Sequence, residues 1–250
     1  DKITAIDSKK TAGQTLEDVV AQIRGKEGTT VEIELKTVAG EVKTVRVIRS
    51  DIKLETVAGE MKNNKIGYIR IGMFNENTGS DFIKKFHELE GQGMEGLVLD
   101  LRDNPGGLLS ESVKVAELMV PKGPIVSVTE RSGKSVTEYS SLEKTKYPVA
   151  VIVNQGTASA AEIVAGALQD TKAGKLFGTK TFGKGSVQAV SNLDESTGMK
   201  LTIARYYTPS GRSINGTGIE PDVVIEAAGE TGENQLTEAI SYLEKELVKK

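Results

Sequence analysis

From about Ile52 onward the sequence alternates between short apolar runs and stretches with helical periodicity. The clearest apolar run, at 149–153, leads directly into one of these helical stretches. We expect extended segments at 65–71, 96–101, 125–130, 149–153, near 176, near 187 and at 201–204, and helices at 77–90, 109–119, 158–170 and 234–247. Such alternation buries one face of each helix against a sheet, so it predicts an α/β fold.

Residues 1–50 have a different character, because strand patterns dominate and only one helix is expected. Extended segments are predicted at 3–6, 31–35 and 45–47, and a helix at 15–24. Thr15 is a suitable N-cap residue and Gly25 a suitable stop. Three or four strands with one helix enclose little core. We therefore expect two domains, 1–50 and 51–250, and a first domain whose N-terminal half is missing.

Composition and charge exclude several classes of function. The chain has 250 residues and a formal charge of −3, from 32 basic and 35 acidic residues without a basic stripe, so nucleic acid is not an expected partner. No apolar run approaches the ~20 residues of a membrane helix. With no cysteine and one histidine, neither a disulfide framework nor a clustered metal site is expected, and no cofactor is implied. The start at Asp1, without a methionine, indicates a processed or recombinant piece.

Two motifs suggest a serine nucleophile served by a lysine base. Gly-Thr-Ala-Ser-Ala-Ala-Glu at 156–162 opens a helix after the apolar strand, and Thr-Phe-Gly-Lys-Gly-Ser-Val-Gln at 181–188 follows it. A hydroxyl at Ser159 would lie beside the unpaired N–H groups of a helix start, which suit a developing oxyanion. Lys184 lies in a glycine-flanked turn that permits close approach.

A lysine side chain acts as a base only when its pKa falls from ~10.4 toward neutrality, which burial away from carboxylates can achieve. Phe182 and Val187 beside Lys184 favour such an apolar setting, and Gln188 can hold the amine without adding charge. Each residue also has a simpler interpretation. Ser159 can be a hydrogen-bonding residue of a helix start, Lys184 a solvated turn lysine and Gln188 a structural amide.

A second glycine-containing turn follows the strand expected at 96–101. The sequence Asp-Leu-Arg-Asp-Asn-Pro-Gly-Gly at 100–107 ends that strand before another helix, and consecutive glycines bring backbone N–H groups close to a ligand. Gly106 and Gly107 are therefore candidate oxyanion donors. The alternative is a tight turn in which Asp100 and Arg102 form a structural pair.

The sequence also contains partial signals for three rival chemistries. His87 is the only histidine available for a Ser/His/Asp triad, but the charged residues around it indicate a solvated helix face. Two Ser-x-x-Lys matches, Ser50/Lys53 and Ser141/Lys144, lack the companion motifs of penicillin-binding enzymes. The segment 178–185 nearly matches a nucleotide-binding P-loop, but Gly185 replaces the magnesium-binding hydroxyl and a strand is expected after it.

Taken together, the motifs resemble those of the carboxyl-terminal processing, or tail-specific, serine peptidases. The resemblance rests on the segments 100–107, 156–162, 181–188, 204–212 and 218–222, and it covers residues 52 to 226. It implies a mixed-sheet catalytic core with helices packed on the sheet. It also implies a serine endopeptidase that forms an acyl-enzyme and requires no cofactor.

Carried over by motif, the resemblance assigns the nucleophile to Ser159, the base to Lys184 and the lysine-orienting amide to Gln188. The oxyanion donors would be the backbone N–H of Ala160 and one from the turn at Gly106 and Gly107. These residues leave the choice between the two glycines open. The resemblance also gives Asp170 as a supporting residue, because it matches an aspartate that matters in some members of the family.

Residues 1–37 resemble the second half of the PDZ module of this family, without the preceding strand and loop that hold a peptide end. The resemblance implies protein substrates with exposed C-terminal tails, an extracytoplasmic location, a membrane anchor in a removed segment and dimerisation in the full-length protein. The alternative, from another class of function, is a catalytically silent peptide-binding or regulatory scaffold. A P-loop-like nucleotide hydrolase is the remaining alternative.

Overall fold

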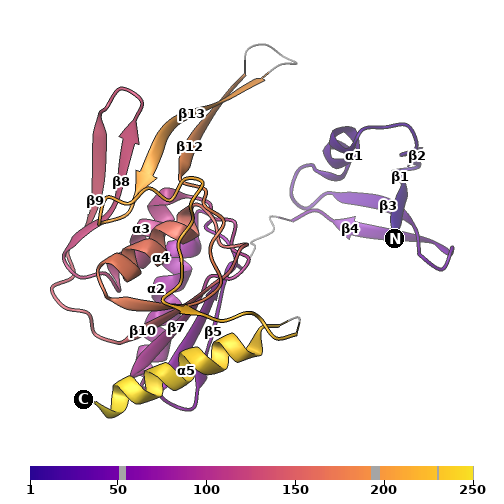
Figure 1. Cartoon of the computed structure of the whole chain (residues 1–250). Coiled ribbons are helices and arrows are strands. Elements are labelled where there is room, and N and C mark those ends of the chain that lie inside the picture. Colours follow the sequence, from indigo (N-terminus) through magenta and orange to yellow (C-terminus); the bar gives the residue numbers. More distant parts are fainter. Residues whose placement is uncertain (51–54, 193–197, 230, 250) are drawn as a thin grey trace. The chain divides into compact units, whose positions relative to one another are not determined.

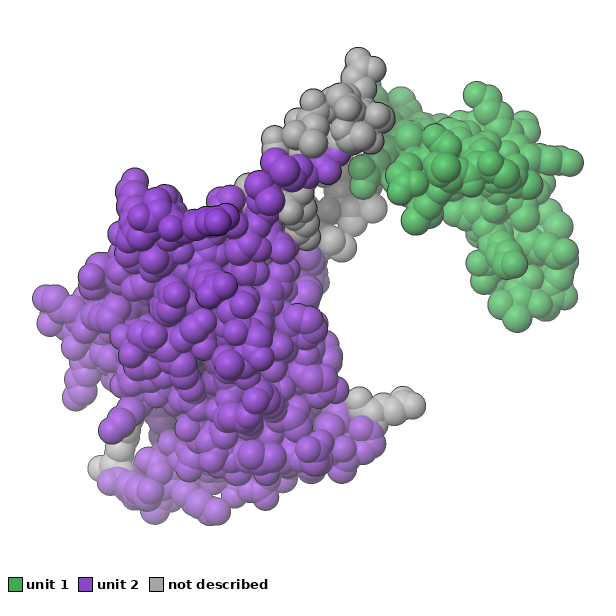
Figure 2. Space-filling model, turned by 45° about the horizontal axis from the view of Figure 1, so that its top comes forward, with its two compact units in different colours: residues 1–54 green, residues 55–250 purple. Residues whose placement is uncertain are grey.

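The computed structural model describes residues 1–50, 55–192, 198–229 and 231–249, and it divides the chain into two compact units. Unit 1 comprises Asp1–Leu54 and unit 2 comprises Glu55–Lys250 (Figure 2). The sequence predicted a boundary between residues 50 and 51, close to this division.

Unit 1 is an antiparallel four-stranded sheet in the order β2-β1-β3-β4, with one helix. Its elements are β1 (Lys2–Ile6), β2 (Lys9–Lys10), α1 (Leu16–Ile23), β3 (Thr30–Lys36) and β4 (Val42–Ile48). The predicted cap is present, because the Thr15 hydroxyl accepts a hydrogen bond from the N–H of Asp18. Among residues 1–50, the buried apolar residues are Ala5, Ile6 and Val31. The core is small, as the sequence indicated, and the PDZ assignment stays a prediction.

Unit 2 is built on a mixed six-stranded sheet with the order β14-β11-β10-β7-β6-β5. The strands are β5 (Val57–Lys62), β6 (Ile66–Ile71), β7 (Gly96–Asp100), β10 (Val149–Val153), β11 (Gly174–Gly178) and β14 (Val223–Val224). All neighbouring pairs are parallel except β5 with β6, which is antiparallel. Parallel order places the carboxyl ends of β7 and β10 side by side, so the loops that follow both strands meet at one edge.

Helices cover both faces of this sheet (Figure 1). They are α2 (Thr78–Gly91), α3 (Leu109–Glu117), α4 (Ala160–Asp170) and α5 (Glu233–Val248). The larger apolar core lies between the sheet and α2, α3 and α4, whereas α5 packs Leu236, Ala239 and Leu243 on the opposite face. All five residues of β7 and of β10 are buried, as their continuous apolar sequence requires.

A second, antiparallel sheet with the order β12-β13-β8-β9 adjoins this core. Its strands are β8 (Gly123–Glu130), β9 (Ser135–Ser140), β12 (Ser186–Asn192) and β13 (Gly198–Tyr207). In Figure 1 the hairpin of β12 and β13 extends away from the helices. The inner face of β13 is anchored by Ala204 and Tyr206, which are buried.

The predicted α/β fold is confirmed, and the predicted helices are present within a few residues of their expected ends. Four strands were missed: β2, β5, β9 and β14. β2 and β14 have two residues each, β5 contains Gly59, which weakens a strand pattern, and β9 has four exposed residues among its six. All four lie at sheet edges, where little of a strand needs to be apolar.

A buried ion pair joins the end of β7 to the start of α5. The Arg102 guanidinium donates to both carboxylate oxygens of Asp100, with an Nη2 to Oδ2 distance of 2.6 Å, and also to the carbonyls of Thr231 and Gly232. Asp100 is fully buried and also accepts the Tyr68 hydroxyl at 2.8 Å. Burial and the neighbouring Asp100 charge raise the pKa of Tyr68 to about 12. The structural pair considered for Asp100 and Arg102 is present.

We expect Arg102→Met to lower the free energy of unfolding by about 3 to 5 kcal/mol, because it leaves the buried Asp100 carboxylate without its cation. The matched control is Arg70→Met, since Arg70 is half exposed and only 4.0 Å from Asp103, a surface pair worth about 0 to 1 kcal/mol. Urea unfolding followed by circular dichroism compares the two. Equal losses in both variants would contradict this account.

Candidate active site

Ser159 occupies the turn between β10 and α4, as the sequence predicted, and its backbone is strained. Its φ of 55° and ψ of −119° lie in a region that residues with a side chain rarely adopt. Such a conformation costs about 1 to 3 kcal/mol and persists only when the surroundings enforce it. Ser159 is 8% exposed, and the next residue, Ala160, is the first of α4. A serine on a sharp strand-to-helix turn is also how α/β-hydrolases present their nucleophile.

The glycine turn after β7 packs directly against Ser159. A Cβ added to Gly106 would lie 2.7 Å from the Ser159 Cβ and 2.8 Å from the Ala160 nitrogen, so no larger residue fits. The φ values of Gly106 and Gly107, 95° and 141°, also require glycine. The Gly106 N–H donates to Asn104 Oδ1 at 2.8 Å. Within the described residues, neither the Gly107 N–H nor the Ala160 N–H has a hydrogen-bond acceptor.

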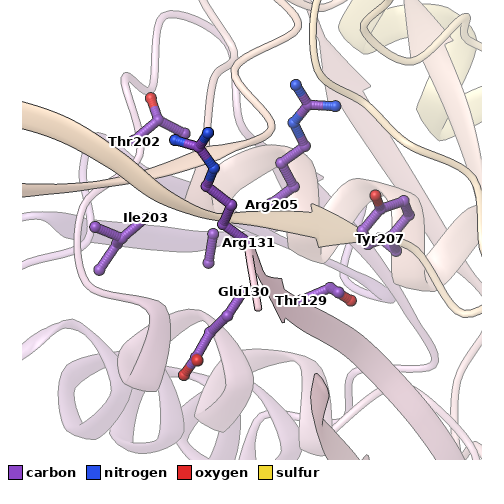
Figure 3. Close-up of a pocket in the computed structure, with 8 residues that line it drawn as sticks. Thr129, Glu130, Arg131, Thr202, Ile203, Arg205 and Tyr207 are labelled. Atoms are coloured by element: carbon purple, nitrogen blue, oxygen red, sulfur yellow. The ribbon is translucent and has the colours of Figure 1, made fainter. Parts of the chain in front are cut away.

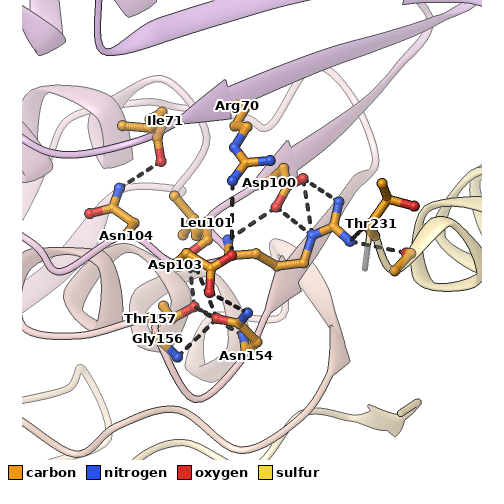
Figure 4. A network of polar contacts seen from close by, with 12 residues as sticks. Arg70, Ile71, Asp100, Leu101, Asp103, Asn104, Asn154, Gly156, Thr157 and Thr231 are labelled. Atoms are coloured by element: carbon orange, nitrogen blue, oxygen red, sulfur yellow. Dashed lines mark hydrogen bonds and ion pairs between the residues drawn. The ribbon is translucent and has the colours of Figure 1, made fainter. Parts of the chain in front are cut away.

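Hydrogen bonds join the loop after β7 to the loop after β10 (Figure 4). Asn154 Oδ1 accepts the Asp103 N–H at 2.9 Å, and the Asn154 amide donates back to Asp103 Oδ1 at 2.8 Å. The buried Thr157 hydroxyl donates to the Leu101 carbonyl at 2.7 Å. The Ala158 N–H donates to the Asn104 carbonyl at 2.9 Å. The two loops that carry the candidate nucleophile and oxyanion donors are therefore fixed to each other.

A buried carboxylate connects the serine turn to the lysine turn. Glu162, in the first turn of α4, is fully buried and accepts the Ser159 N–H at 2.9 Å and the Lys184 N–H at 2.8 Å on the same oxygen, Oε2. Its other oxygen, Oε1, accepts the Gly183 N–H at 2.8 Å and the Thr181 hydroxyl. One side chain thus fixes the backbone on both sides of the candidate dyad.

The Lys184 and Gln188 side chains are exposed in this structure. The apolar enclosure expected around Lys184 is not present, because Phe182 is itself 67% exposed. Among the described residues, no hydrogen bond joins Lys184 Nζ to Ser159 or to Gln188. Just beyond the lysine turn, Val187 pairs with Ala204 and Gln188 with Thr202, so Ile203 of β13 is the extra residue of a β-bulge. The backbone at Lys184 is fixed, whereas its side chain points to solvent.

Asp170, at the end of α4, holds the loop that follows β13. Its Oδ2 accepts the Ser210 N–H at 3.0 Å and the Ser210 hydroxyl at 2.6 Å, and its Oδ1 accepts Arg212 Nη2 at 2.9 Å. Burial raises the pKa of this carboxyl, but the Ser210 hydrogen bonds and the Arg212 charge outweigh it and hold the pKa below its ordinary value. The contacts are those of a residue that orients a loop.

Sequence reasoning did not single out Glu162, although a signal was present. Ser159 and Glu162 have the Ser-x-x-Glu spacing of a capping box, in which the glutamate accepts the N–H of the cap residue. That spacing predicts the bond to Ser159. It does not predict the bonds to Gly183 and Lys184, which are 21 and 22 residues away.

In the described residues, the structure supports none of the three rival chemistries, the histidine triad, the P-loop and the Ser-x-x-Lys pairs. His87 is 59% exposed on its side chain and contacts Glu90 at 2.7 Å on the surface of α2. The lysine of the near P-loop is followed by β12, a strand, as the sequence predicted. Ser141 and Lys144 are exposed, and of the pair Ser50/Lys53 the lysine lies outside the described residues.

Among the residues that the structure describes, no group of three or more His, Asp or Glu side chains is placed to hold a metal ion. Among the same residues, no helix combines the length and apolar character needed to cross a membrane.

The strained serine at a strand-to-helix turn and the free N–H groups beside it are features of the serine hydrolases. Comparison with known proteins gives the family: a family model for peptidase family S41 matches residues 65–225, and the chain belongs to this family. The matched residues lie within unit 2 and include Ser159, Lys184 and Gln188.

Relatives and solved structures agree with this family. The chain is 42% identical over 231 residues to a carboxyl-terminal-processing protease of Picosynechococcus, covering 90% of this chain and 56% of the relative. It is 40% identical over 228 residues to the carboxy-terminal processing protease CtpA of Bacillus subtilis, covering 90% and 49%. The structure of a photosystem II D1 C-terminal processing protease superposes with a TM-score of 0.64 at 34% identity, covering 90% and 62%. The chain spans about half the length of these curated relatives.

We expect Glu162→Gln to lower kcat by about 10-fold to 100-fold with little change in KM, because misplacing the Ser159 and Lys184 backbones disturbs the site. Each carboxylate oxygen accepts at least one backbone N–H, so the glutamine NH2 would oppose a backbone donor in either orientation. Steady-state kinetics with a protein substrate measures both constants.

The matched control for this variant is Glu111→Gln. Glu111 is also a buried glutamate in a first helical turn, and it accepts the Gly79 N–H at 2.9 Å and Lys114 at 2.7 Å. We expect it to lose stability without losing kcat. Equal losses of kcat in both variants, or an unchanged kcat in Glu162→Gln, would contradict the positioning role.

We expect Asp170→Asn to destabilise the protein at neutral pH but not in strong acid. A carboxyl with a lowered pKa in the folded state stabilises the fold above its unfolded pKa, about 3.9, and this contribution is lost as the pH falls through the folded value. Urea unfolding of parent and variant near pH 7 and near pH 2 measures the difference. A difference that persists undiminished in acid would show that the charge of Asp170 is not its source.

Proposed function

We propose that this chain is the catalytic part of a serine endopeptidase of the C-terminal processing type, with Ser159 as nucleophile, Lys184 as base and Gln188 as the amide that orients the lysine. The observation that supports it most is the joint restraint of the first two residues. Ser159 is held in a strained conformation, and Glu162 binds its N–H and that of Lys184 through one oxygen. Membership of peptidase family S41 supports the same reaction class.

The proposed reaction is acyl transfer to serine. Neutral Lys184 removes the Ser159 proton, and the alkoxide attacks the carbonyl carbon of a peptide bond. The tetrahedral oxyanion accepts hydrogen bonds from the Ala160 N–H and from the glycine turn. Lys184 then gives its proton to the leaving amine. Water, deprotonated by the same lysine, hydrolyses the acyl-enzyme and releases the acid product.

Of the two glycines, Gly107 is the better proposed donor. The Gly106 N–H already donates to Asn104 Oδ1, whereas the Gly107 N–H has no acceptor among the described residues. Gly106 then has a different role, in which its missing side chain lets the turn approach Ser159 and Ala160. The proposed oxyanion site therefore consists of one N–H from the start of α4 and one from the turn after β7.

The proposed substrates are proteins with exposed C-terminal tails. The relatives with this name include a chloroplastic C-terminal processing peptidase at 35% identity as well as bacterial proteases. An extracytoplasmic location, a PDZ-like role for residues 1–50 and a homodimer of the full-length protein belong to the same proposal. Asp170 is proposed as a supporting residue that orients the loop at Ser210.

One observation favours a second candidate, a silent peptide-binding or regulatory scaffold. The Lys184 side chain is exposed and does not contact Ser159 in the described part of the chain, so the dyad is not assembled here. A rotation of the lysine side chain on its fixed backbone would convert this arrangement into the active one. A scaffold would keep the two apart in the presence of substrate.

We expect cleavage of an unstructured protein with an apolar C-terminal tail by the parent chain, and its loss in Ser159→Ala. Lys184→Arg is also expected to abolish turnover, because arginine stays protonated at any working pH. The same cleavage assay is run on a version of the chain that carries a complete PDZ module. Mass spectrometry identifies the cleavage products. Activity only in the completed version would assign the switch to that module. Ser159-independent cleavage, or none in any version, would favour the scaffold.

A further inference from the structure

Two consecutive glycines give the turn after β7 peptide planes that rotate freely unless other groups hold them. Gly106 and Gly107 have φ values of 95° and 141°, in a region where only glycine is unstrained, and neither has a side chain that restricts rotation. An oxyanion donor is effective only when its N–H is already directed at the site before the reaction. The turn therefore needs groups that fix its peptide planes, and two neighbouring segments supply them.

The backbone of Phe74 holds the peptide plane between the two glycines. The Phe74 N–H donates to the Gly106 carbonyl at 2.9 Å, and the Phe74 carbonyl accepts the Leu108 N–H at 2.8 Å. The C=O and N–H of one trans peptide point in opposite directions. The Gly107 N–H belongs to the same peptide as the Gly106 carbonyl, so it points away from the Phe74 backbone. Among the described residues it has no acceptor.

The side chain of Asn104 holds the preceding peptide plane. Its Oδ1 accepts the Gly106 N–H at 2.8 Å, and its Nδ2 donates to the Ile71 carbonyl at 2.8 Å (Figure 4). Only one orientation of the amide serves both groups, because a carbonyl only accepts and an N–H only donates. Asn104 is fully buried, so water does not compete for either bond. The peptide planes on both sides of Gly106 are thus fixed, one by Asn104 and one by Phe74.

The backbone of Asn104 also joins the glycine turn to the serine turn. Its carbonyl accepts the Ala158 N–H at 2.9 Å, and Ala158 directly precedes Ser159. The two turns pack closely, since a Cβ added to Gly106 would lie 2.7 Å from the Ser159 Cβ. A shift of Asn104 would therefore move the glycine turn relative to the proposed nucleophile.

We propose that Asn104 is the positioning residue of the oxyanion site. It binds the Gly106 N–H and fixes the turn, which leaves the Gly107 N–H available to the oxyanion. This proposal rests on the proposed function, because the oxyanion forms only when Ser159 attacks a carbonyl. The buried Asn104 side chain does not touch the substrate, so its loss should weaken binding of the tetrahedral species and leave binding of the substrate itself unchanged.

The experiment compares two ligands and requires no turnover. A short peptidyl boronic acid forms a tetrahedral adduct with a serine hydroxyl and places an oxygen at the position of the oxyanion. The same peptide with a hydrogen atom in place of the boronic acid group forms no adduct. Calorimetry gives the Kd of both ligands for the parent chain and two variants.

The two variants separate the hydrogen bonds of Asn104. Asn104→Leu keeps the branched shape of the side chain and removes both bonds, whereas Asn104→Asp keeps an acceptor for the Gly106 N–H and loses the donor to Ile71. Circular dichroism checks that each variant is folded. Asn104→Ala, which also removes both bonds, replaces Asn104→Leu if that variant does not fold.

Two control variants separate positioning from a general loss of stability. Gln235→Met removes another buried amide, which donates to the Ile225 carbonyl at 2.8 Å and lies on α5, on the opposite face of the sheet from α4. Arg131→Gln changes a hollow of about 410 Å³ on the second sheet, lined by residues 129–131 and by β13 and by none of residues 104–107 (Figure 3). We expect both controls to bind the boronic acid as the parent does.

We expect Asn104→Leu to weaken binding of the boronic acid by about 10-fold to 100-fold and binding of the hydrogen analogue by less than about twofold, because a misplaced donor affects only the tetrahedral species. Asn104→Asp should bind the boronic acid more tightly than Asn104→Leu. Unchanged affinity in Asn104→Leu, equal losses with both ligands, or an Asn104→Asp variant no better than Asn104→Leu would overturn the positioning role. A parent chain that does not bind the boronic acid would overturn Ser159 as nucleophile, and with it this proposal.

Discussion

The arrangement of the site depends on one buried anion, the Glu162 carboxylate at the start of α4. It accepts three backbone N–H groups and one hydroxyl, and it lies where the helix dipole favours negative charge. No lysine or arginine among the described residues pairs with it, so three backbone N–H groups and the Thr181 hydroxyl offset its desolvation. Because two of those donors belong to Ser159 and Lys184, satisfying the carboxylate also sets the separation of the two turns.

The second constraint on the site is the order of strands in the sheet, which brings the loop after β7 next to the loop after β10. β7 and β10 are parallel neighbours, so the loops after them leave the same edge, and the Asn154 and Thr157 hydrogen bonds fix one to the other. Gly106 can then contact Ser159 because it has no side chain. The strained conformation of Ser159 persists because these hydrogen bonds and contacts already fix the backbone around it.

The sequence predicted what is local and missed what is not. The strand at 149–153, the helix after it and the positions of Ser159 and Lys184 on their turns follow from apolar runs, glycines and motif order. The links from Glu162 to Gly183 and Lys184 did not, because they join segments that no short-range pattern connects. The proposed choice of Gly107 over Gly106 rests on the Asn104 side chain, and the exposure of Lys184 depends on a side-chain conformation that sequence does not encode.

The strain at Ser159 also bears on the choice between enzyme and scaffold. A serine with this positive φ and a ψ of −119° costs about 1 to 3 kcal/mol, a considerable fraction of the stability of a domain. A peptide-binding scaffold gains nothing from it, since the sheet does not require that conformation. A peptidase does gain, because the same backbone places a hydroxyl beside two N–H groups that have no other acceptor in the described structure. The strain at Ser159 therefore favours the enzyme over the scaffold.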